Sequence, residues 1–378
     1  MFVLCIVVDA EGLEEGNMNK MRANRHTKKE IPIVITKYEN NPLIKPSDVI
    51  PSLKGYKVLG AFNPGATVFG DEILLLLRVA EGCESQEGVV RTPIYHFDGK
   101  KSYPSIMEFK TDDPNVQLKD TRGVVYKGKD FLSTASHIRI ARSKDGLNFT
   151  VDKNPFLYPV NEREKYGCED VRITKIDGRY YLNFTVISED SWSTMLAVTD
   201  DFKTVERKGI IFHPENKDVA IFPERIGGKY VALHRPNNSG FGKAAIWYAE
   251  SPDLLHWGNH RSLVHGRDMV YENIKIGGGA PPIKTDQGWL IIYHGKGEVG
   301  YSLFCLLLDL EDPTKIVKRA EEPLITPTEK YELEGFFGKV VFSNGVAEKD
   351  GKLFVYYGAS DETSCVLITD VNSLLASF

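Results

Sequence analysis

An acidic pair, Glu169 and Asp170, stands at the entrance of a segment that otherwise has the pattern of a core-forming β-hairpin. Residues 172–176 alternate in polarity, Asp177-Gly178 favours a tight turn, and residues 180–186 are aromatic and β-branched. Carboxylates are seldom placed next to a buried strand without a partner or a task, so this pair is a candidate for acid or base chemistry. The alternative is an Asx turn that only closes the hairpin.

Further polar side chains occupy matching places in similar hairpins. These are Arg78, Arg235 and His294 at the ends of second strands, Lys275 and Asp361 just outside equivalent strands, and Asn63 and Asp170 at the starts of first strands. Taken singly, the basic residues could be solvated, the histidine structural and Asp361 a turn cap. Their shared positions favour one pocket that holds an isolated acid among several cations.

The hairpins that carry these residues form an internal repeat. Aligned on their turns, they cover residues 66–77, 166–185, 221–233, 282–293 and 346–357. Repeated antiparallel hairpins at a regular spacing are typical of the blades of a β-propeller. Ends of the inner strands of a propeller converge on its central channel, which would bring the polar residues together.

A second repeated element sets the number of blades. Five strands end in a turn with an acid followed by an apolar residue, at residues 141–149, 197–202, 249–257, 308–313 and 368–371. A further hairpin around Gly128 has no such partner, so we interpret residues 82–134 as an insertion in blade one. The sequence therefore predicts an all-β protein, a five-bladed β-propeller.

Composition is that of an ordinary globular enzyme. The chain has 378 residues, 42% hydrophobic and 26% charged, and a net charge of −5 gives no reason to expect nucleic acid or a membrane as partner. We expect residues 1–30 to be a loose extension and residues 31–378 to form one catalytic domain, with a strand within residues 32–38 closing the ring. Five cysteines without metal-type spacing favour reduced thiols and a cytoplasmic protein.

No nucleophile triad, dinucleotide fingerprint or zinc spacing is present, so we expect neither a metal nor a cofactor. The run Gly277-Gly-Gly-Ala-Pro-Pro282 is glycine-rich but lacks the Gly-Lys-Ser/Thr ending of a phosphate-binding P-loop. It more plausibly lets the backbone come close to a ligand or to a neighbouring blade.

From about residue 38 to its end, the chain resembles the β-mannoside phosphorylases of glycoside hydrolase family 130. The motifs that carry the resemblance are Asn63-Pro-Gly-Ala-Thr, Glu169-Asp-Val-Arg172, Phe222-Pro-Glu-Arg-Ile with His234-Arg-Pro236, Lys275-Ile-Gly-Gly-Gly, Trp289-Leu-Ile-Ile-Tyr-His-Gly295 and Tyr356-Tyr-Gly-Ala-Ser-Asp361. They agree with the family in order and spacing. The family fold is a five-bladed propeller, in agreement with the blade count.

The resemblance implies that Asp170 is the single catalytic acid of an inverting phosphorolysis, with its proton relayed through a hydroxyl of the mannose. An inverting hydrolase needs a second carboxyl group, about 6.5–9.5 Å away, to activate water. Inorganic phosphate, the co-substrate, is already an anionic nucleophile that needs only positioning and charge neutralisation.

The resemblance also implies two sets of binding residues. Arg235, Lys275, His294 and Tyr301 match phosphate contacts. Lys217 is assigned to phosphate as well, but Lys217-Asp218 depart from the family pattern, since related enzymes often have Arg-Asn there. Asn63, Arg78 and Asp361 match positions near the mannose, with Arg139 a weaker candidate.

Three other functions remain open at this stage. A β-mannosidase of the same family would use water, but this chain keeps Arg235 and Lys275. A five-bladed furanosidase would need several separated carboxylates, and a non-catalytic sugar-binding propeller is opposed only by Asp170 beside the cations. The length of the insertion and the Gly277–Gly279 run favour β-1,2-mannobiose or β-1,2-oligomannan as substrate. β-1,4-Mannooligosaccharides are an alternative substrate. A homo-oligomer is possible.

Overall fold

The protein, described by a computed structural model, is built almost entirely of β-strands. The structure describes residues 33–378 except residues 85, 100, 119–122 and 238–240, so the extension predicted for residues 1–30 lies outside the described residues. Helix in the described part is limited to short segments such as α1 (Lys330–Leu333) and α2 (Val371–Ala376). The prediction of an all-β protein is confirmed.

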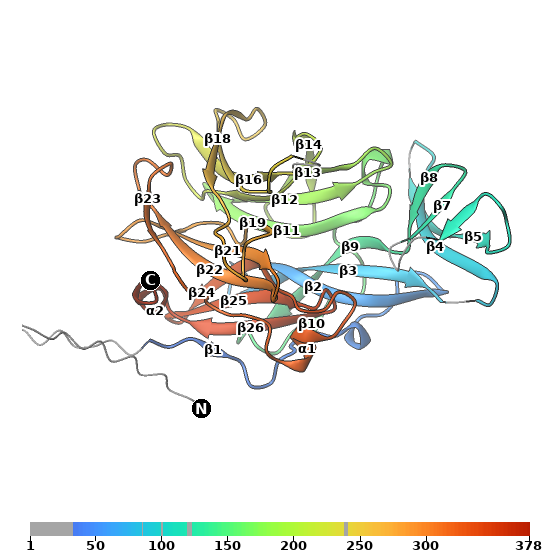
Figure 1. Cartoon of the computed structure of the whole chain (residues 1–378), viewed down its shortest axis with the longest axis horizontal. Coiled ribbons are helices and arrows are strands. Elements are labelled where there is room, and N and C mark those ends of the chain that lie inside the picture. The colour runs from blue at the N-terminus through green and yellow to red at the C-terminus, as the bar shows by residue number, and fades with distance from the viewer. Residues whose placement is uncertain (1–32, 85, 100, 119–122, 238–240) are drawn as a thin grey trace, which may run out of the picture. The chain divides into compact units, whose positions relative to one another are not determined.

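The strands form five consecutive antiparallel groups, named units one to five here, of which units one and two are joined into one eight-stranded sheet by a parallel bridge between Gly167 and Ser136 (Figure 1). Unit one contains β2 (Tyr56–Phe69), β3 (Glu72–Cys83), β9 (Ala135–Ser143) and β10 (Thr150–Val151). Unit two contains β11 (Gly167–Ile176), β12 (Arg179–Ile187), β13 (Trp192–Thr199) and β14 (Glu206–Phe212). Unit three contains β15 (Asn216–Ile221), β16 (Tyr230–Pro236), β17 (Ile246–Ser251) and β18 (Gly258–Val264).

The last two units each include an additional feature. Unit four contains β19 (Lys275–Gly278), β21 (Trp289–Gly297), β22 (Gly300–Leu308) and β23 (Ile316–Arg319), with β20 (Ile283–Lys284) also paired to β21. Unit five contains β24 (Val341–Lys349), β25 (Lys352–Ala359), β26 (Thr363–Thr369) and β1 (Thr36–Lys37). The first strand of the described chain thus completes its last sheet, and the strand predicted within residues 32–38 is confirmed for Thr36–Lys37.

In units one, two and five the predicted hairpins coincide with the first two strands, whereas in unit four the predicted hairpin is formed by β20 and β21, and in unit three it begins only at the last residue of β15. In the hairpin of unit two, Ile176 pairs with Arg179 across the turn, and Asp177 and Gly178 have φ of 49° and 83°. Positive φ at both central residues is the geometry of a type I′ turn, which suits the twist of a hairpin. The five acid-bearing turns follow the third strands, β9, β13, β17, β22 and β26.

Between β3 and β9, which pair with each other, the chain makes two small sheets. The first contains β4 (Val89–Phe97) and β5 (Ser102–Lys110), and the second contains β6 (Val116–Leu118), β7 (Gly123–Tyr126) and β8 (Lys129–Leu132). Figure 1 shows them together at the end of β3, away from units four and five. They have their own small core of Ile94, Phe109, Val124 and Phe131.

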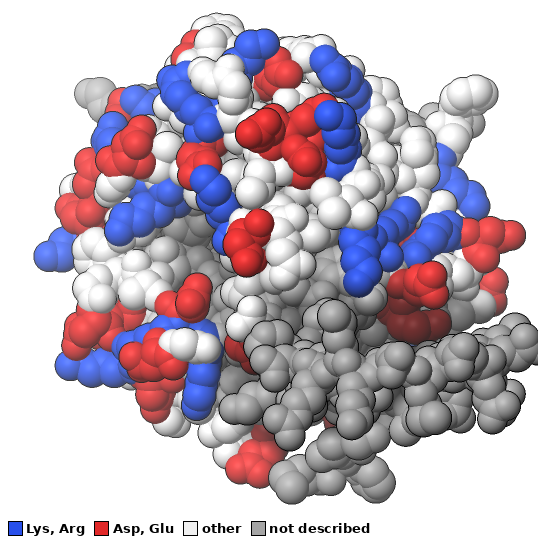
Figure 2. All heavy atoms as spheres, turned by 90° about the vertical axis from the view of Figure 1, so that its left-hand side faces the viewer, with Lys and Arg blue, Asp and Glu red and all other residues white. Residues whose placement is uncertain are grey.

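The main core consists of apolar clusters that join one unit to the next. One cluster, for example, packs strands of units three and four together, with Trp289 fully buried and its ring 5.1 Å from that of Phe222. Acidic and basic side chains are interspersed on the face in Figure 2, so the described residues there form no large region of one sign. None of the helices in the described ranges is long and apolar enough to cross a membrane.

Candidate active site

The candidate site begins with β-bulges in the first strands of three consecutive units. The strand register shifts between Phe62 and Gly65 in β2, between Glu169 and Arg172 in β11, and between Lys217 and Ala220 in β15. Each bulge contains one residue with positive φ, namely Asn63 (48°), Asp170 (52°) and Asp218 (55°). Bulges redirect side chains out of the alternating pattern of a strand, which is why they occur next to active sites.

Asp170 lies in a polar cluster, named here the acid group, with Glu169, Asp361, Asn63 and Arg78. Its side chain is almost buried; Asn63 Nδ2 donates to Asp170 Oδ1 over 3.0 Å, and Arg78 Nη1 lies 3.4 Å from the same oxygen. Arg78 Nη2 also forms a 2.6 Å ion pair with Glu169 Oε1. One guanidinium therefore orients both members of the acidic pair.

Burial raises the pKa of Glu169, and the neighbouring Asp170 carboxylate adds to this, although Arg78 opposes it. Asp361 follows the end of β25, with φ of 53°, and burial together with Asp170 and Glu169 raises its pKa to about 6. Three carboxyl groups thus share one arginine. Such crowding favours one of them holding a proton near neutral pH.

The residues predicted to bind phosphate form a second cluster, named here the basic group: Lys217, Arg235, Lys275, His294 and Tyr301. Lys217 and Arg235 are paired across β15 and β16, and the Lys275 ammonium lies 5.5 Å from the centre of the Tyr301 ring. The rings of His294 and Tyr301 are 5.8 Å apart. Lys275, predicted to lie just outside a strand, is the first residue of β19.

Electrostatics within the basic group reflect its crowding. Burial, with Arg235 and Lys217 adding to it, lowers the pKa of Lys275 to about 8. Burial lowers the pKa of His294 to about 4, so this imidazole is neutral at physiological pH. His294 Nδ1 has no hydrogen-bond partner within the described chain, and Nε2 lies 3.4 Å from Asp218 Oδ2. A site of this kind gains from binding an anion.

Asp218, which the sequence pointed to only as a departure, together with Lys217, from the Arg-Asn pair of related enzymes, also belongs to the site. It is buried; its Oδ2 lies 2.6 Å from Arg235 Nε and 3.4 Å from His294 Nε2, and its Oδ1 lies 3.4 Å from Arg172 Nη2. The charge of the Arg235 guanidinium, with that of Arg172 beside it, holds the pKa of Asp218 well below its usual range in spite of burial. The signal was present, because Lys217-Asp218-Val219 aligns with Glu169-Asp170-Val171 in the hairpin repeat.

The run Gly277–Gly279 brings backbone against this carboxylate. A Cβ on Gly277 would collide with Asp218 Oδ2 and come within 2.6 Å of His294 Nε2. Arg172 donates from Nε to the carbonyl of Gly279 over 2.6 Å and from Nη2 to that of Gly278 over 2.8 Å. The glycines therefore make room for the Asp218 contacts and link unit two to unit four.

The acid and basic groups lie next to each other. The ammonium of Lys217 helps to lower the pKa of both Glu169 and Asp361, against the larger effect of burial. Burial raises the pKa of Tyr301, and Asp361 and Asp170 contribute to the increase. Nine of the ten residues predicted from sequence are thus brought into two adjoining clusters.

Arg139 is the exception. Its Nε donates to His137 Nε2 over 3.0 Å, and His137 Nδ1 lies 3.5 Å from Glu81 Oε2. Burial lowers the pKa of Arg139 while Glu81 and Tyr95 oppose this, and no contact with Asp170 or Arg78 is recorded among the described residues. The structure thus places Arg139 in a different cluster, with His137, Glu81 and Tyr95 of β4.

The arrangement can donate a proton on one side and bind an anion on the other. Within the described ranges no three His, Cys, Asp or Glu side chains are grouped to hold a metal ion. The four described cysteines, Cys83, Cys168, Cys305 and Cys365, are free thiols.

Comparison with known proteins gives consistent matches. The family model for glycoside hydrolase family 130, described as β-1,4-mannooligosaccharide phosphorylase, matches residues 113–377. The chain is 46% identical over 333 residues to β-1,2-mannobiose phosphorylase of Listeria innocua serovar 6a, which covers 86% of this chain and 93% of the relative. It is 40% identical over 243 residues to 1,2-β-oligomannan phosphorylase of Thermoanaerobacter sp. strain X514, covering 63% and 80%.

The fold is also similar to a solved structure. The complex of β-1,2-mannobiose phosphorylase from Listeria innocua with β-1,2-mannobiose superimposes with a TM-score of 0.85 at 44% identity, over 91% of this chain and 98% of that one. A GH130 structure described with glycoside hydrolases that target β-1,2-mannosidic linkages has a TM-score of 0.68 at 22% identity, which bears on the fold alone.

Proposed function

The chain belongs to glycoside hydrolase family 130 and is an enzyme of the mannoside phosphorylase type, and from this premise we propose that it cleaves β-1,2-mannobiose or short β-1,2-oligomannan with inorganic phosphate. The products are α-mannose 1-phosphate and the shortened sugar, and the reaction is reversible. The linkage rests on the higher identity to the β-1,2 relatives, because the β-1,4-mannooligosaccharide phosphorylase of Ruminococcus albus is 33% identical.

The observation that carries the proposal is the juxtaposition of Asp170 with the basic group. Asp170 donates the proton that the departing sugar oxygen needs, through a mannose hydroxyl as the family resemblance implies. Phosphate attacks the anomeric carbon from the opposite face, so the bond from carbon to the departing sugar breaks as the bond to phosphate forms. Inversion of a β-mannoside then gives the α-phosphate.

Each cluster has a distinct task in this reaction. Arg235 can grip two phosphate oxygens with its planar fork, whereas Lys275 and Lys217 act as point charges. Asp218 fixes the Arg235 guanidinium by its 2.6 Å contact with Nε, which leaves the terminal nitrogens to face phosphate. Asn63, Arg78 and Asp361 surround Asp170 and are assigned to the mannose. Phosphate is itself the nucleophile, so the proposal includes neither a metal nor a cofactor.

The proposal includes closure of the five units into a five-bladed β-propeller. Support comes from hydrogen bonds between consecutive units, among them Thr194 Oγ1 to Asn216 O over 3.3 Å and Tyr301 N to Lys339 O over 2.9 Å. Units five and one are joined by Asn344 Nδ2, which donates to Asn63 O over 3.2 Å. The bulge residues of β2, β11 and β15 would then face one channel. A cytoplasmic location, consistent with the free thiols, is part of the same proposal.

Dependence on phosphate tests the reaction directly. We expect cleavage of β-1,2-mannobiose to require phosphate and to release α-mannose 1-phosphate, followed by NMR of the anomeric proton and phosphorus. Equal rates in phosphate-free buffer with free mannose as product would instead make the protein a hydrolase. A panel of β-1,2- and β-1,4-linked mannobioses in the same assay tests the linkage.

The basic group can be tested by substitution. Arg235→Ala should raise the KM for phosphate by roughly 10- to 150-fold, the equivalent of about 1.5–3 kcal/mol for a charge-assisted hydrogen bond, and should change the KM for the mannoside much less. Arg235→Lys should recover only part of the loss, because an ammonium lacks the planar fork. A rise in the KM for the mannoside alone, with the KM for phosphate unchanged, would place Arg235 in a sugar subsite.

A further inference from the structure

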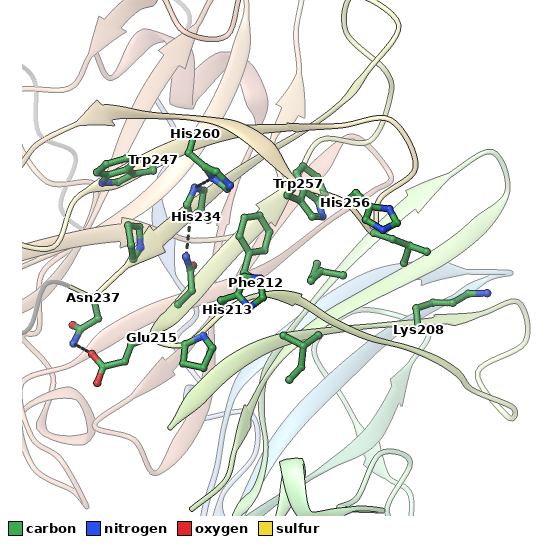
Figure 3. Close-up of a pocket in the computed structure, with 16 residues that line it drawn as sticks. Lys208, Phe212, His213, Glu215, His234, Asn237, Trp247, His256, Trp257 and His260 are labelled. Carbon is green, nitrogen blue, oxygen red and sulfur yellow. Dashed lines mark hydrogen bonds between the residues drawn. The ribbon is translucent and has the colours of Figure 1, made fainter. Parts of the chain in front are cut away.

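A groove of 780 Å³ runs between the outer edge of unit two and the side of unit three, apart from the candidate active site (Figure 3). Its walls come from β14, from the segment that leads into β15, and from β16, β17 and β18. It contains none of the acid-group or basic-group residues. A groove of this size accommodates a ligand of several rings.

The floor of the groove is a row of aromatic rings. Ring centres are 5.3 Å apart for Trp257 and Phe212, 4.6 Å for Phe212 and His234, and 6.4 Å for His234 and Trp247. Phe212 and His234 are buried, whereas both tryptophans are partly exposed. Figure 3 shows the two tryptophans on opposite sides of His234 and Phe212, so flat apolar surface is available at both ends of the row.

Hydrogen-bonding groups surround this floor. His213, His256 and His260 are exposed, and Asn237 Nδ2 donates to Glu215 Oε2 over 2.7 Å at the end of the groove shown on the left of Figure 3. Lys208 and Glu215 contribute one charge of each sign. The groove therefore favours an uncharged ligand with many hydroxyl groups over an anion such as a nucleotide.

The groove is adjacent in sequence to the basic group. Asn216 and His234 line it, and the residues that follow them, Lys217 and Arg235, belong to the basic group on the other face of β15 and β16. Asn216 is buried and bonded through Nδ2 to His234 Nδ1 over 2.9 Å, while its Oδ1 has no partner in the described part of the chain. A ligand in the groove would contact β15 and β16, the strands that carry Lys217 and Arg235.

We propose that this groove is a second carbohydrate site, which binds a β-linked mannan segment by stacking sugar rings on Trp257 and Trp247. The identity of the sugar rests on the proposed function. Pyranose rings present an apolar face and a hydroxyl rim, which match an aromatic floor edged by imidazole, amide and carboxylate groups. The site keeps the enzyme on a longer chain while the active site removes its end.

Binding stoichiometry tests the proposal. β-1,2-Mannotetraose is titrated calorimetrically into the full-length protein in phosphate-free buffer, where phosphorolysis cannot proceed. We expect two sites in the wild-type protein and one in the Trp247→Ala/Trp257→Ala variant, with the second affinity reduced at least about tenfold. Phosphorolysis of mannobiose should stay within about twofold of wild type. Tyr103→Ala, an exposed aromatic residue in β5, is the matched control and should keep both sites.

Loss of packing is separated from loss of binding by a second variant. His213→Ala/His256→Ala changes only exposed rim residues and should weaken the same site, with an unchanged unfolding midpoint. Tryptophan emission gives an independent signal. Trp257→Phe should reduce the response to mannotetraose, whereas Trp192→Phe, which lies beside Lys217 of the basic group, should keep the part of the response that comes from the groove. A single site in the wild-type protein would overturn the inference and leave the proposed function standing. Absence of both binding and phosphorolysis would overturn the proposed function.

Discussion

At the scale of single residues, the chemistry of the site depends on how charges are shared. In the acid group, Arg78 pairs with Glu169 and Asp170, and beside the basic group, Asp218 pairs with Arg235. In each case one residue of opposite charge holds its neighbours in position. A buried charge without such a partner would cost several kcal/mol, of the order of 3–5. Pairing therefore lets a proton donor and an anion site exist side by side in a largely buried place.

Asp170→Asn should abolish phosphorolysis with little change in stability. The amide is nearly isosteric and can keep a contact with Asn63, but it has no proton to donate to the departing sugar. General acid catalysis contributes about 10²- to 10⁴-fold, so a loss of at least this size in kcat is expected. Normal turnover of a correctly folded variant would remove Asp170 from its role.

Lys275 should set the alkaline limit of phosphate use. Burial and the neighbouring cations lower its pKa to about 8, so its ammonium is lost as the pH rises through 8. The value of kcat/KM for phosphate should then fall by about tenfold per pH unit above that point. In Lys275→Arg the fall should move to higher pH, because a guanidinium stays charged. An identical pH profile for the two proteins would contradict the assignment.

At the scale of elements, bulges and glycines decide where the functional side chains point. Asn63, Asp170 and Asp218 all have positive φ at a register shift of a first strand, so each leaves the ordinary alternation of its strand. Gly277 lies against Asp218 and His294 from the first strand of unit four. The functional side chains thus lie at irregular positions of otherwise regular strands.

Gly277→Ala tests whether the close approach of Gly277 to Asp218 and His294 matters for function. The added methyl group meets Asp218 and His294, so it should displace Arg235 indirectly and raise the KM for phosphate, at a stability cost of about 1–3 kcal/mol. Gly258→Ala is the matched control, because a Cβ there has no atom within 4 Å among its surroundings and the position has no positive φ. Equal phosphate kinetics in the two variants would show that the close approach at Gly277 has no functional consequence.

At the scale of the whole molecule, the described chain is held together because its first strand, β1, pairs with β26 in the last sheet. Thr36 and Lys37 pair with Ile368 and Leu367 of β26, and Lys37 Nζ forms a 2.6 Å ion pair with the fully buried Glu332. The pairing joins unit five to the segment that precedes unit one. In the proposed ring, this closure keeps units five and one from separating.

Removing β1 should therefore lower the stability of the whole fold. A chain that begins at Glu39 is compared with one that begins at Ile33, so that only residues 33–38 differ. Loss of the partner of buried Glu332 alone is expected to cost about 3 kcal/mol. Urea unfolding measures the difference, and superimposable transitions for the two chains would show that β1 does not close the structure.

Much of the protein can be predicted from local sequence patterns. The hairpin around Asp177-Gly178 depends on turn chemistry and alternating polarity, which are properties of neighbouring residues. The repeat of such hairpins and of the third-strand turns predicts five similar units and places Arg78, Arg235 and His294 at equivalent positions of the second strands. The prediction that they lie at strand ends is wrong for Arg78 and His294, which lie within β3 and β21. The family motifs add the chemical roles, and the comparisons confirm the family.

Contacts between residues that lie far apart in the chain depend on the tertiary structure. Asp218 could be aligned with Asp170 from the repeat, yet its contacts with Arg172, Arg235 and His294 depend on three units coming together. Alternation puts Arg139 on the same face of β9 as His137, but only packing decides that this face meets Glu81 and Tyr95. The aromatic groove has no sequence signature either, because its rings come from β14, β16, β17 and the turn before β18. Local propensity determines each strand, whereas burial and charge pairing between strands determine which side chains meet.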